Sequence, residues 1–273
     1  MERTFEVPSM KLKSRLSRFS YQILKLLSRT KLGQSFLTLS TLFTINQTRQ
    51  TNIRNQKISF SYVSDTWLPR RFLDVERLEP DTLSWIDEMS EGSMLWDIGA
   101  NVGGYSIYAA KSKGCSVFAF EPSPFNLEFL ARNIWLNNLE DKITVIPIAI
   151  SEFASRAPFV MKRIEWAGSG SSFFESETAN YDDKNFKYNT IGLPADRLLE
   201  IFNIPFPNYL KLDVDGIEAL ILSGAKEVLS KTTSVLVEVQ HSTLEEQLIH
   251  KCLEEAGLTK QKVARQNEIW IRQ

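Results

Sequence analysis

The sequence contains few cysteines and no long hydrophobic run. Its 273 residues include only Cys115 and Cys252, which lie far apart and suggest neither a disulfide framework nor a zinc site. The most apolar stretch, residues 36–45, is too short to span a bilayer and contains polar residues. The charged N-terminal segment also lacks the apolar core of a secretory signal. We therefore expect a cytoplasmic chain in a reducing compartment, with no bound metal.

Charge is unevenly distributed along the chain. The net charge is −1, but residues 1–57 contain eleven Lys or Arg and two Glu, which leaves a net charge of −10 on the remainder. With 43% hydrophobic and 24% charged residues, the composition excludes a disordered or fibrous protein, and the length allows one large α/β domain with an appendage. We predict a basic N-terminal extension over residues 1–57 and a folded domain over residues 58–273.

The basic extension contains an amphipathic pattern. Apolar residues recur there at helical spacing with basic residues between them, namely Leu12, Leu16, Phe19, Ile23 and Leu26. This predicts a helix within residues 9–29 that is able to lie on an anionic membrane surface. The same pattern also fits a helix that packs on its own domain or on a partner, and the sequence leaves these alternatives open.

The folded domain opens with a strand, a glycine turn and a helix at residues 96–106. An apolar run breaks at Gly99 and again at Gly103, where glycine lets the backbone turn sharply and approach a ligand. A second apolar run, residues 117–120, ends in Glu121, 24 positions after Asp97. This is close to the spacing of a carboxylate that binds ribose hydroxyls. The pattern predicts a nucleoside site.

The details of the turn favour S-adenosylmethionine over a nicotinamide dinucleotide. A dinucleotide fingerprint places glycine where this chain has Asn101, so that the pyrophosphate can approach the backbone. Asp97 lies two residues before Gly99, where a carboxylate would repel pyrophosphate but attract a positively charged sulfonium and amino group. The turn therefore indicates methyl transfer rather than hydride transfer.

Strands and helices alternate along most of the domain. The predicted strands include residues 58–63, 143–150, 207–214 and 234–240, and the predicted helices include residues 80–89, 105–113, 216–229 and 242–257, the last with a capping box from Ser242 to Glu245. The runs 259–264 and 268–271 predict a closing hairpin. Repeated β-α units of this size predict an α/β fold with a mostly parallel sheet, helices on both faces and a ligand crevice at the carboxyl ends of the strands. An antiparallel last strand fits a class I methyltransferase.

The alternation fails between residues 151 and 192. The stretch from residue 167 to residue 180 is rich in Gly, Ser and acidic residues. We expect a long insertion there, which is either a surface loop or a lid that binds the substrate.

Four segments together resemble the FkbM-type methyltransferase family: residues 96–106, 118–126, 209–218 and 235–239. The resemblance covers about residues 78–240 and leaves the basic extension outside it. It implies a class I methyltransferase Rossmann-like fold with a mostly parallel seven-stranded sheet. It also implies S-adenosylmethionine as the methyl donor and O-methylation of a hydroxyl on a sugar, a glycan or glycolipid, or a natural product. The nature of the acceptor does not follow from it.

The resemblance also implies roles for individual residues. Those expected to bind the cofactor are Asp97, Gly99, Asn101, Gly103, Tyr105, Glu121, Pro122, Ser151 and Asp213. Those expected to bind the acceptor are Ser171, Ser172, Asp215 and Glu218. One departure is Glu152, where family members often have Asp after the serine, and it bears on the adenine contact expected near Ser151.

Methyl transfer to a hydroxyl also needs a group that removes the alcohol proton. Asp213 ends a predicted strand, and Glu238 and His241 follow at the end of the next one. We therefore predict that Asp213 orients the acceptor or the methionine amino group. We expect His241 or Glu238 to be the general base, and His241 has a pKa suited to neutral pH.

Three other functions were weighed against this one. Asp213 and Asp215 resemble a metal-binding pair of a sugar transferase, but Gly216 suggests that the strand has already turned. A nucleic-acid methyltransferase would bring an Asn-Pro-Pro-Tyr-like or Pro-Cys motif, and neither occurs, so we expect no nucleic-acid partner. The third is a catalytically inactive nucleoside-binding partner in a membrane-associated glycan assembly complex, and it stays an alternative.

Overall fold

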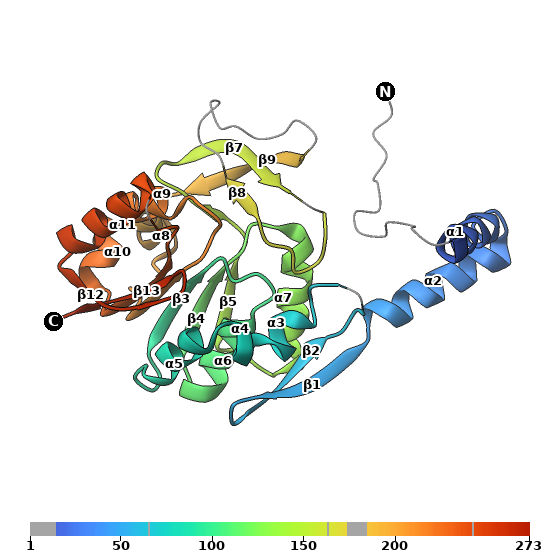
Figure 1. Ribbon diagram of the computed structural model, residues 1–273, viewed down its shortest axis with the longest axis horizontal. Helices are drawn as coiled ribbons and strands as arrows, with labels where there is room; N and C mark the ends of the chain where they lie inside the picture. The colour runs from blue at the N-terminus through green and yellow to red at the C-terminus, as the bar shows by residue number, and fades with distance from the viewer. Residues whose placement is uncertain (1–14, 65, 163, 174–184, 242) are drawn as a thin grey trace.

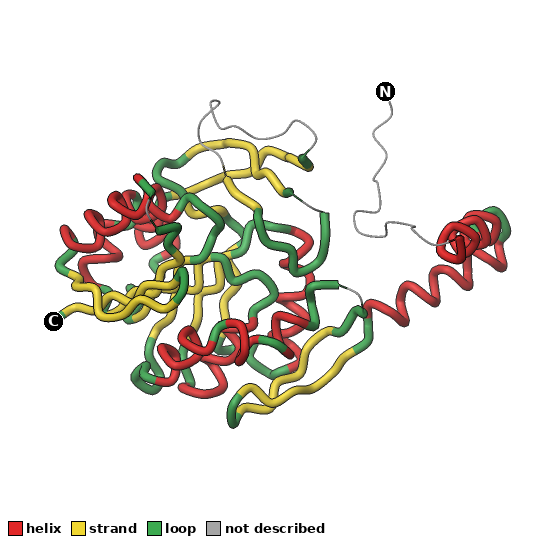
Figure 2. The backbone as a smooth tube through the Cα atoms, in the orientation of Figure 1, coloured by secondary structure: helices red, strands yellow, loops and turns green. Residues whose placement is uncertain are grey.

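The computed structural model describes residues 15–64, 66–162, 164–173, 185–241 and 243–273. Figures 1 and 2 show a central sheet flanked by helices, a second sheet beside it, and a pair of helices that projects from the body. The carboxyl ends of the central strands face the second sheet, and this arrangement positions the site.

The central sheet has seven strands in the order β12-β13-β11-β10-β3-β4-β5. The parallel strands are β3 (Met94–Ile98), β4 (Ser116–Phe120), β5 (Ile143–Ile146), β10 (Tyr209–Leu212) and β11 (Ser234–Glu238). The predicted hairpin forms β12 (Leu258–Ala264) and β13 (Asn267–Arg272), with β13 antiparallel to both β11 and β12. The predicted fold class is confirmed. The chain leaves β3 toward β4 and later returns to its other side as β10, so a ligand crevice is expected between these strand ends.

Helices cover both faces of this sheet (Figure 1). One face packs against α5 (Pro80–Asp87), α6 (Gly104–Lys113) and α7 (Pro124–Leu136), and the other against α8 (Ala195–Phe202), α9 (Glu218–Ser223), α10 (Lys226–Lys231) and α11 (Leu244–Glu255). Side chains alternate along each strand, so Leu95 joins the first apolar layer and Trp96 joins the second. Strands that are buried on both faces consist of nearly continuous apolar residues, and this is why the sequence predicted them.

Two predicted elements are divided in the structure. The strand expected over residues 143–150 is split into β5 and β6 (Ala149–Ile150), because Pro147 lacks the N–H that a continuous ladder needs. The helix expected over residues 216–229 is broken at Gly224 into α9 and α10. A Cβ at Gly224 would lie 2.6 Å from the backbone oxygen of Ser151, so the chains approach too closely there for a side chain.

The capping prediction for α11 is displaced by one residue. Thr243 is the N-cap, and its Oγ1 accepts a hydrogen bond from the Glu246 N–H at 3.2 Å. Ser242, the predicted cap, lies outside the described residues.

The insertion at residues 151–192 contains strands that the sequence analysis did not predict. β7 (Ser155–Met161), β8 (Ser171–Phe173) and β9 (Phe186–Leu193) form a second sheet with β6, in the order β6-β9-β7-β8. Phe159, Met161 and Phe173 are buried against the central sheet. Residues 174–184, which include part of the acidic stretch, lie outside the described residues.

The N-terminal region begins with two helices, α1 (Arg15–Leu27) and α2 (Lys31–Ile45). Residues 9–14 of the predicted amphipathic helix lie outside the described residues. After α2 the chain forms a hairpin of β1 (Thr48–Ile53) and β2 (Gln56–Ser61), followed by the short helices α3 (Arg70–Leu73) and α4 (Val75–Leu78).

Two asparagines attach the hairpin to the body: Asn133 within α7 and Asn137 at its C-terminal cap. The Asn133 Oδ1 accepts from the Ser61 N–H at 2.8 Å and its Nδ2 donates to the Val102 oxygen at 2.9 Å, while the Asn137 Oδ1 accepts from the Ser59 N–H at 3.0 Å. The proposed domain boundary after residue 57 falls inside β2. We therefore propose that the helical extension ends at Ile45 and that the hairpin belongs to the body.

Replacing Asn133 with Ala should lower the free energy of unfolding by about 2–4 kcal/mol, because it leaves the buried Ser61 N–H and Val102 oxygen without partners. Chemical denaturation would measure the change. The exposed Thr144→Ala on β5 is the control and should stay within about 0.5 kcal/mol of the unsubstituted protein. An equal loss in the two variants would contradict the anchoring role of Asn133.

Candidate functional site

A cleft of about 180 Å³ opens at the carboxyl ends of β3, β4 and β10. Of the residues predicted to bind the cofactor, those that line it are Gly99, Asn101, Tyr105, Glu121, Pro122 and Asp213. Of the residues predicted to bind the acceptor, those that line it are Ser171, Ser172 and Asp215. The fold thus brings together residues from four distant parts of the chain.

The glycine turn after β3 is held between two neighbouring strands. The N–H groups of Gly99 and Ala100 both donate to the Phe120 oxygen at 3.0 Å. Gly99 has φ +87°, and a Cβ there would lie 1.9 Å from the Asp213 backbone oxygen. Only glycine satisfies both requirements. Gly103 has φ +88° and packs against Leu130, so it shapes the turn without lining the cleft.

Glu121 lies at the end of β4 with its carboxylate held in place. Its Oε2 accepts from the Asn101 N–H and its Oε1 from the Ser123 N–H, both at 2.8 Å. Burial raises the pKa of Glu121 to about 7, although these hydrogen bonds oppose the rise. Each carboxylate oxygen can accept a further hydrogen bond. The position and chemistry of Glu121 fit the ribose-binding role expected from the sequence.

Asn101 carries a polar atom that also fits a ligand. Its Nδ2 donates to the Gly168 oxygen at 2.8 Å, which ties the glycine turn to the inserted sheet. Its Oδ1 is buried and has no hydrogen-bond partner within the described chain. A buried acceptor without a partner is costly, so a ligand that donates a hydrogen bond here would be stabilised.

A buried lysine lies beneath the cleft, and the sequence analysis did not identify it. Lys211 of β10 is opposite Asp97 of β3, and its Nζ lies 2.9 Å from the Asp213 Oδ2 and 3.8 Å from the Asp97 Oδ1. The same Nζ lies 4.9 Å from the centre of the Tyr105 ring. The lysine side chain is only 2% exposed, and a buried cation needs such partners.

Asp97 occupies a different position from the one expected. Its side chain is fully buried, accepts a hydrogen bond from the Ser106 Oγ at 2.6 Å, and faces Lys211 rather than the cleft lining. Its other oxygen, Oδ1, is buried and has no hydrogen-bond partner among the described residues. The direct attraction between Asp97 and a sulfonium that the sequence analysis predicted stays a prediction.

Two carboxyl groups at neighbouring strand ends have opposite protonation preferences. Desolvation raises the pKa of Asp213, but the attraction of Lys211 and Arg71 outweighs it and leaves that pKa below its ordinary value. Burial and the Asp213 charge raise the pKa of Glu238 to about 8. At neutral pH the pair therefore holds an ionised Asp213 and a protonated Glu238.

The turn after β10 is held by hydrogen bonds to two carboxylates, Glu218 and Asp215. The Glu218 carboxylate accepts from the Val214 N–H at 3.1 Å and the Gly216 N–H at 3.0 Å, and it is buried under the turn rather than in the cleft lining. The Asp215 Oδ2 accepts from the Gly170 N–H at 2.6 Å. These bonds join the turn to the inserted sheet, and they give Glu218 a structural position where an acceptor contact was expected.

The metal-binding alternative finds no support in this geometry. Asp213 is paired with the Lys211 ammonium, and Asp215 accepts a backbone N–H. Divalent cations require carboxylate oxygens that are free to converge on one point.

Ser151, which was expected to contact the cofactor, does not line the cleft. Its Oγ donates a hydrogen bond to the Phe153 oxygen at 2.8 Å.

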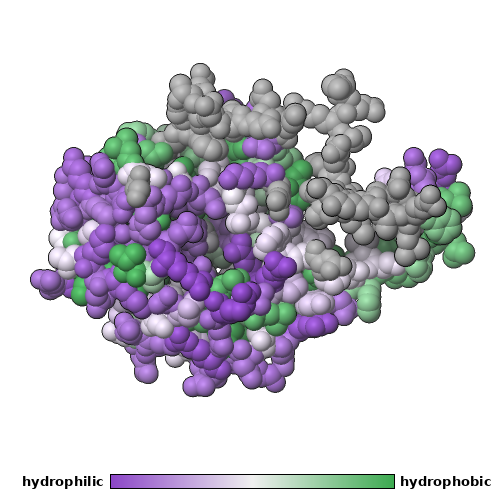
Figure 3. Space-filling view, viewed as in Figure 1, coloured by the Kyte–Doolittle hydropathy of each residue, from purple (hydrophilic) through white to green (hydrophobic). Residues whose placement is uncertain are grey.

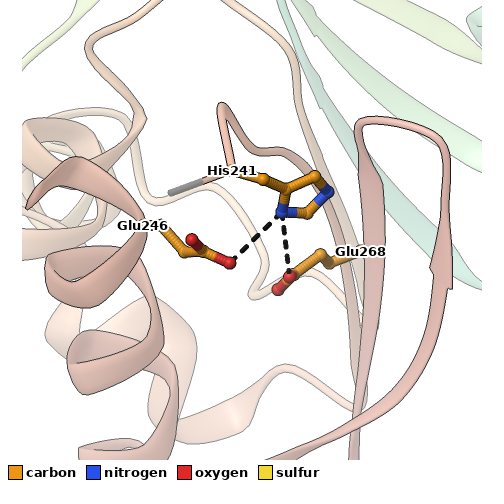
Figure 4. Close-up of side chains that lie close together, drawn as sticks. All are labelled: His241, Glu246 and Glu268. Atoms are coloured by element: carbon orange, nitrogen blue, oxygen red, sulfur yellow. Dashed lines mark hydrogen bonds and ion pairs between the residues drawn. The ribbon is translucent and has the colours of Figure 1, made fainter. Parts of the chain in front are cut away.

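His241 lies outside the cleft lining, in a separate cluster beside α11 and β13 (Figure 4). Its Nε2 is 3.0 Å from the Arg265 oxygen, and its Nδ1 is 3.2 Å from a Glu246 oxygen and 3.9 Å from a Glu268 oxygen. These hydrogen bonds raise the pKa of His241. The Lys260 ammonium, 2.9 Å from Glu268, already balances that buried carboxylate, so the cluster is accounted for as a charge network.

Two arginines of α3 line the cleft and were also missed by the sequence analysis. The Arg71 guanidinium donates to the Ala167 oxygen at 3.3 Å, and the Arg70 guanidinium carbon lies 4.8 Å from the centre of the Trp67 ring. Both precede the segment that resembles the family, so no motif pointed to them. Lys211 did carry a signal, since a lysine between Leu210 and Leu212 in an apolar strand implies a buried cation with acidic partners.

The affinity for S-adenosylhomocysteine, the spent form of the expected donor, should decrease as pH falls below about 7. Ribose hydroxyls donate to an ionised Glu121, so binding and protonation compete, and Kd should rise about tenfold for each pH unit below the pKa. Calorimetric titration over this pH range would measure the slope. Glu121→Gln should bind weakly with little pH dependence, while the exposed Glu140→Gln is the control. A slope that survives in Glu121→Gln would contradict this role.

Comparison with known proteins extends the geometric result. The family model described as the methyltransferase FkbM domain matches residues 97–260. Hexuronic acid methyltransferase AglP of Haloferax volcanii is 30% identical to this chain over 176 residues, which are 64% of this chain and 66% of that protein. The chain thus spans slightly less than two thirds of that relative.

Solved structures are more distant. The methyltransferase FkbM of Methylobacillus flagellatus KT is 18% identical with a TM-score of 0.46, over 67% of this chain and 44% of that one. The fibrillarin of Aeropyrum pernix, solved with bound S-adenosyl-L-methionine, is 11% identical with a TM-score of 0.44, over 83% and 82%. The family model covers more than half of the sequence. The chain therefore belongs to the FkbM methyltransferase family, and S-adenosylmethionine is its methyl donor.

Proposed function

We propose that this protein transfers a methyl group from S-adenosylmethionine to a hydroxyl of an acidic sugar, free or within a glycan or glycolipid. The observation that carries the proposal is the cleft itself. Glu121, suited to a ribose, and Asp213 line it at the ends of β4 and β10, and Glu238, outside the lining, ends the neighbouring strand β11 and interacts electrostatically with Asp213. The name of the Haloferax volcanii relative supports a hexuronic acid as the acceptor class.

The donor fits the side of the cleft formed by β3 and β4. Glu121 would accept the ribose hydroxyls, and the unpartnered Asn101 Oδ1 would accept a further hydrogen bond. Phe120, Ile148 and Ile150 supply an apolar wall suited to the adenine ring. When bound, S-adenosylmethionine supplies an electrophilic methyl group on a sulfonium. The protein's contribution is then to orient the acceptor hydroxyl, exclude water and remove the proton.

The acceptor fits the side formed by α3 and the inserted sheet. Arg70 lines the cleft there, has no carboxylate partner among the described residues, and stacks on Trp67, which is 39% exposed. A guanidinium can bind a carboxylate through two parallel hydrogen bonds. The hydroxyls of Ser171 and Ser172 line the same side and are suited to sugar hydroxyls.

Proton removal is assigned to the pair of carboxyl groups. During transfer the methyl carbon bonds to the acceptor oxygen and its bond to sulfur breaks, and the hydroxyl proton must go to a base. Asp213 lines the cleft and orients that hydroxyl, and Glu238 on the neighbouring strand takes up the proton when it is ionised. Of the two bases considered from the sequence, the geometry favours Glu238, because His241 is held by Arg265 and Glu246.

Glu238→Gln should lower kcat by about 10²–10⁴-fold, since it removes the general base. In the unsubstituted enzyme kcat should rise with pH until about 8, as Glu238 loses its proton, and then level off. The variant should lose this rise. Steady-state rates across the pH range would measure both effects, and an unchanged profile in Glu238→Gln would remove Glu238 from the mechanism.

The function itself is tested by transfer of labelled methyl groups from S-adenosylmethionine to hexuronic acids, to glycans that contain them, and to the matching neutral sugars. We expect product with the acidic sugars. Arg70→Gln should raise KM for these by about 10-fold or more while kcat changes little, because one charge-assisted contact is lost. The exposed Arg77→Gln is the matched control. Donor binding without transfer to any acceptor would instead favour a catalytically inactive nucleoside-binding partner.

We also propose that the protein acts in the cytoplasm at the inner face of a membrane, with residues 9–29 in contact with it. Among the described residues, no helix combines the length and apolar character needed to cross a bilayer. A peripheral contact of this kind is consistent with acceptors that are carried on lipids.

A further inference from the structure

The helices α1 and α2 carry two stripes of large apolar side chains that face solvent. In α2 the stripe has the spacing i, i+4, i+7, i+11 and consists of Leu32, Phe36, Leu39 and Phe43, which are 57–85% exposed. In α1 the stripe consists of Phe19, Ile23 and Leu26, which are 43–65% exposed. Figure 3 shows this hydrophobic surface on the right of the molecule. Apolar surface on this scale in a folded chain marks an interaction site.

The two helices pack against each other, and within the described residues a hydrogen bond near the end of α2 joins them to the body. The Thr30 Oγ1 caps α2 by accepting from the Gly33 N–H at 3.0 Å. Gly33 packs so closely that a Cβ there would lie 2.1 Å from the Leu27 oxygen, which fixes the two helices against each other. At the other end the Asn46 Oδ1 accepts from Arg132 of α7 at 2.9 Å. Figure 1 shows the pair projecting away from the sheets.

The charge around the stripes has one sign. The sequence has no Asp or Glu between Glu6 and Asp65. In the described part, Lys25, Arg29 and Lys31 flank the turn between the helices. Long basic side chains can reach a headgroup layer while neighbouring apolar residues enter the acyl region. The rest of the chain carries the acidic excess, so an anionic surface would attract this end of the molecule and repel the other.

From these observations we propose that α1 and α2 together form a docking element for an anionic lipid bilayer. This extends the contact beyond residues 9–29 to the whole of α2, and it rests on surface chemistry rather than on the proposed reaction. Basic residues beside exposed apolar stripes suit anionic headgroups above an acyl layer. A second copy would bring another basic, apolar helical pair to the same face, and that contact would gain nothing from charge.

The test uses the full-length protein and lipid vesicles. Vesicles of phosphatidylcholine with phosphatidylglycerol should carry the protein upward in a density gradient, with at least about tenfold stronger binding than vesicles of phosphatidylcholine alone. Added salt should weaken the binding, because the attraction is partly electrostatic. No binding to anionic vesicles would overturn the proposal.

A matched pair of variants identifies the surface. Leu32→Glu with Leu39→Glu should reduce binding to anionic vesicles by about tenfold or more. Leu244→Glu, at a leucine of α11 that is 72% exposed, should leave it unchanged. Unaltered circular dichroism and S-adenosylhomocysteine binding would show that each variant is folded, so failure of docking would be distinguishable from failure of the proposed methyl transfer. Equal losses in both variants would overturn the proposal. So would a dimer that Leu32→Glu with Leu39→Glu dissociates without any effect on vesicle binding.

Discussion

The buried ammonium of Lys211 is the charge on which the rest of the cleft depends. It lies between Asp97 and Asp213, on strands that pair directly in the sheet, and it contacts the face of Tyr105. Removing one partner from such a buried group leaves an uncompensated charge and typically costs about 3–5 kcal/mol. The ammonium lowers the pKa of Asp213, and the ionised Asp213 contributes to the raised pKa of Glu238. Together with burial, which is the largest cause of the raised Glu238 pKa, this lysine therefore influences the proton distribution between Asp213 and Glu238.

The cleft has two sides with different origins. The glycine turn and Glu121 belong to the β3–α6–β4 unit, where backbone geometry is fixed by the close approach of Gly99 to the Asp213 oxygen. The opposite side comes from the inserted sheet, which Asp215 and Asn101 fasten to the turns of the central sheet through Gly170 and Gly168. The side proposed for the donor and the side proposed for the acceptor are therefore built from different parts of the chain.

The sequence was most informative where the structure is determined locally. The glycine turn, Glu121 and the succession of strands and helices along the chain follow from backbone conformation, spacing and apolar patterning, each of which is readable within a single β-α-β unit. The second sheet was missed because its strands pair with segments distant in the sequence, so their residues respond to neighbours that the local pattern does not reveal. Glu238 ends β11 and His241 follows it closely, so both looked equally suited to the site. The His241 ring is instead hydrogen-bonded to the backbone oxygen of Arg265, in the turn between β12 and β13. No local sequence pattern predicts that orientation of the ring.

The most direct measurement of this account is a pH titration of the carboxyl carbons of Asp213 and Glu238 by nuclear magnetic resonance, in the unsubstituted protein and in Lys211→Met. We expect Glu238 to titrate near a pKa of about 8 and the pKa of Asp213 to lie below its ordinary value. In Lys211→Met the Asp213 pKa should rise, because its counter-charge is gone. Ordinary pKa values for both groups, unchanged by loss of Lys211, would contradict the central role of the buried ammonium.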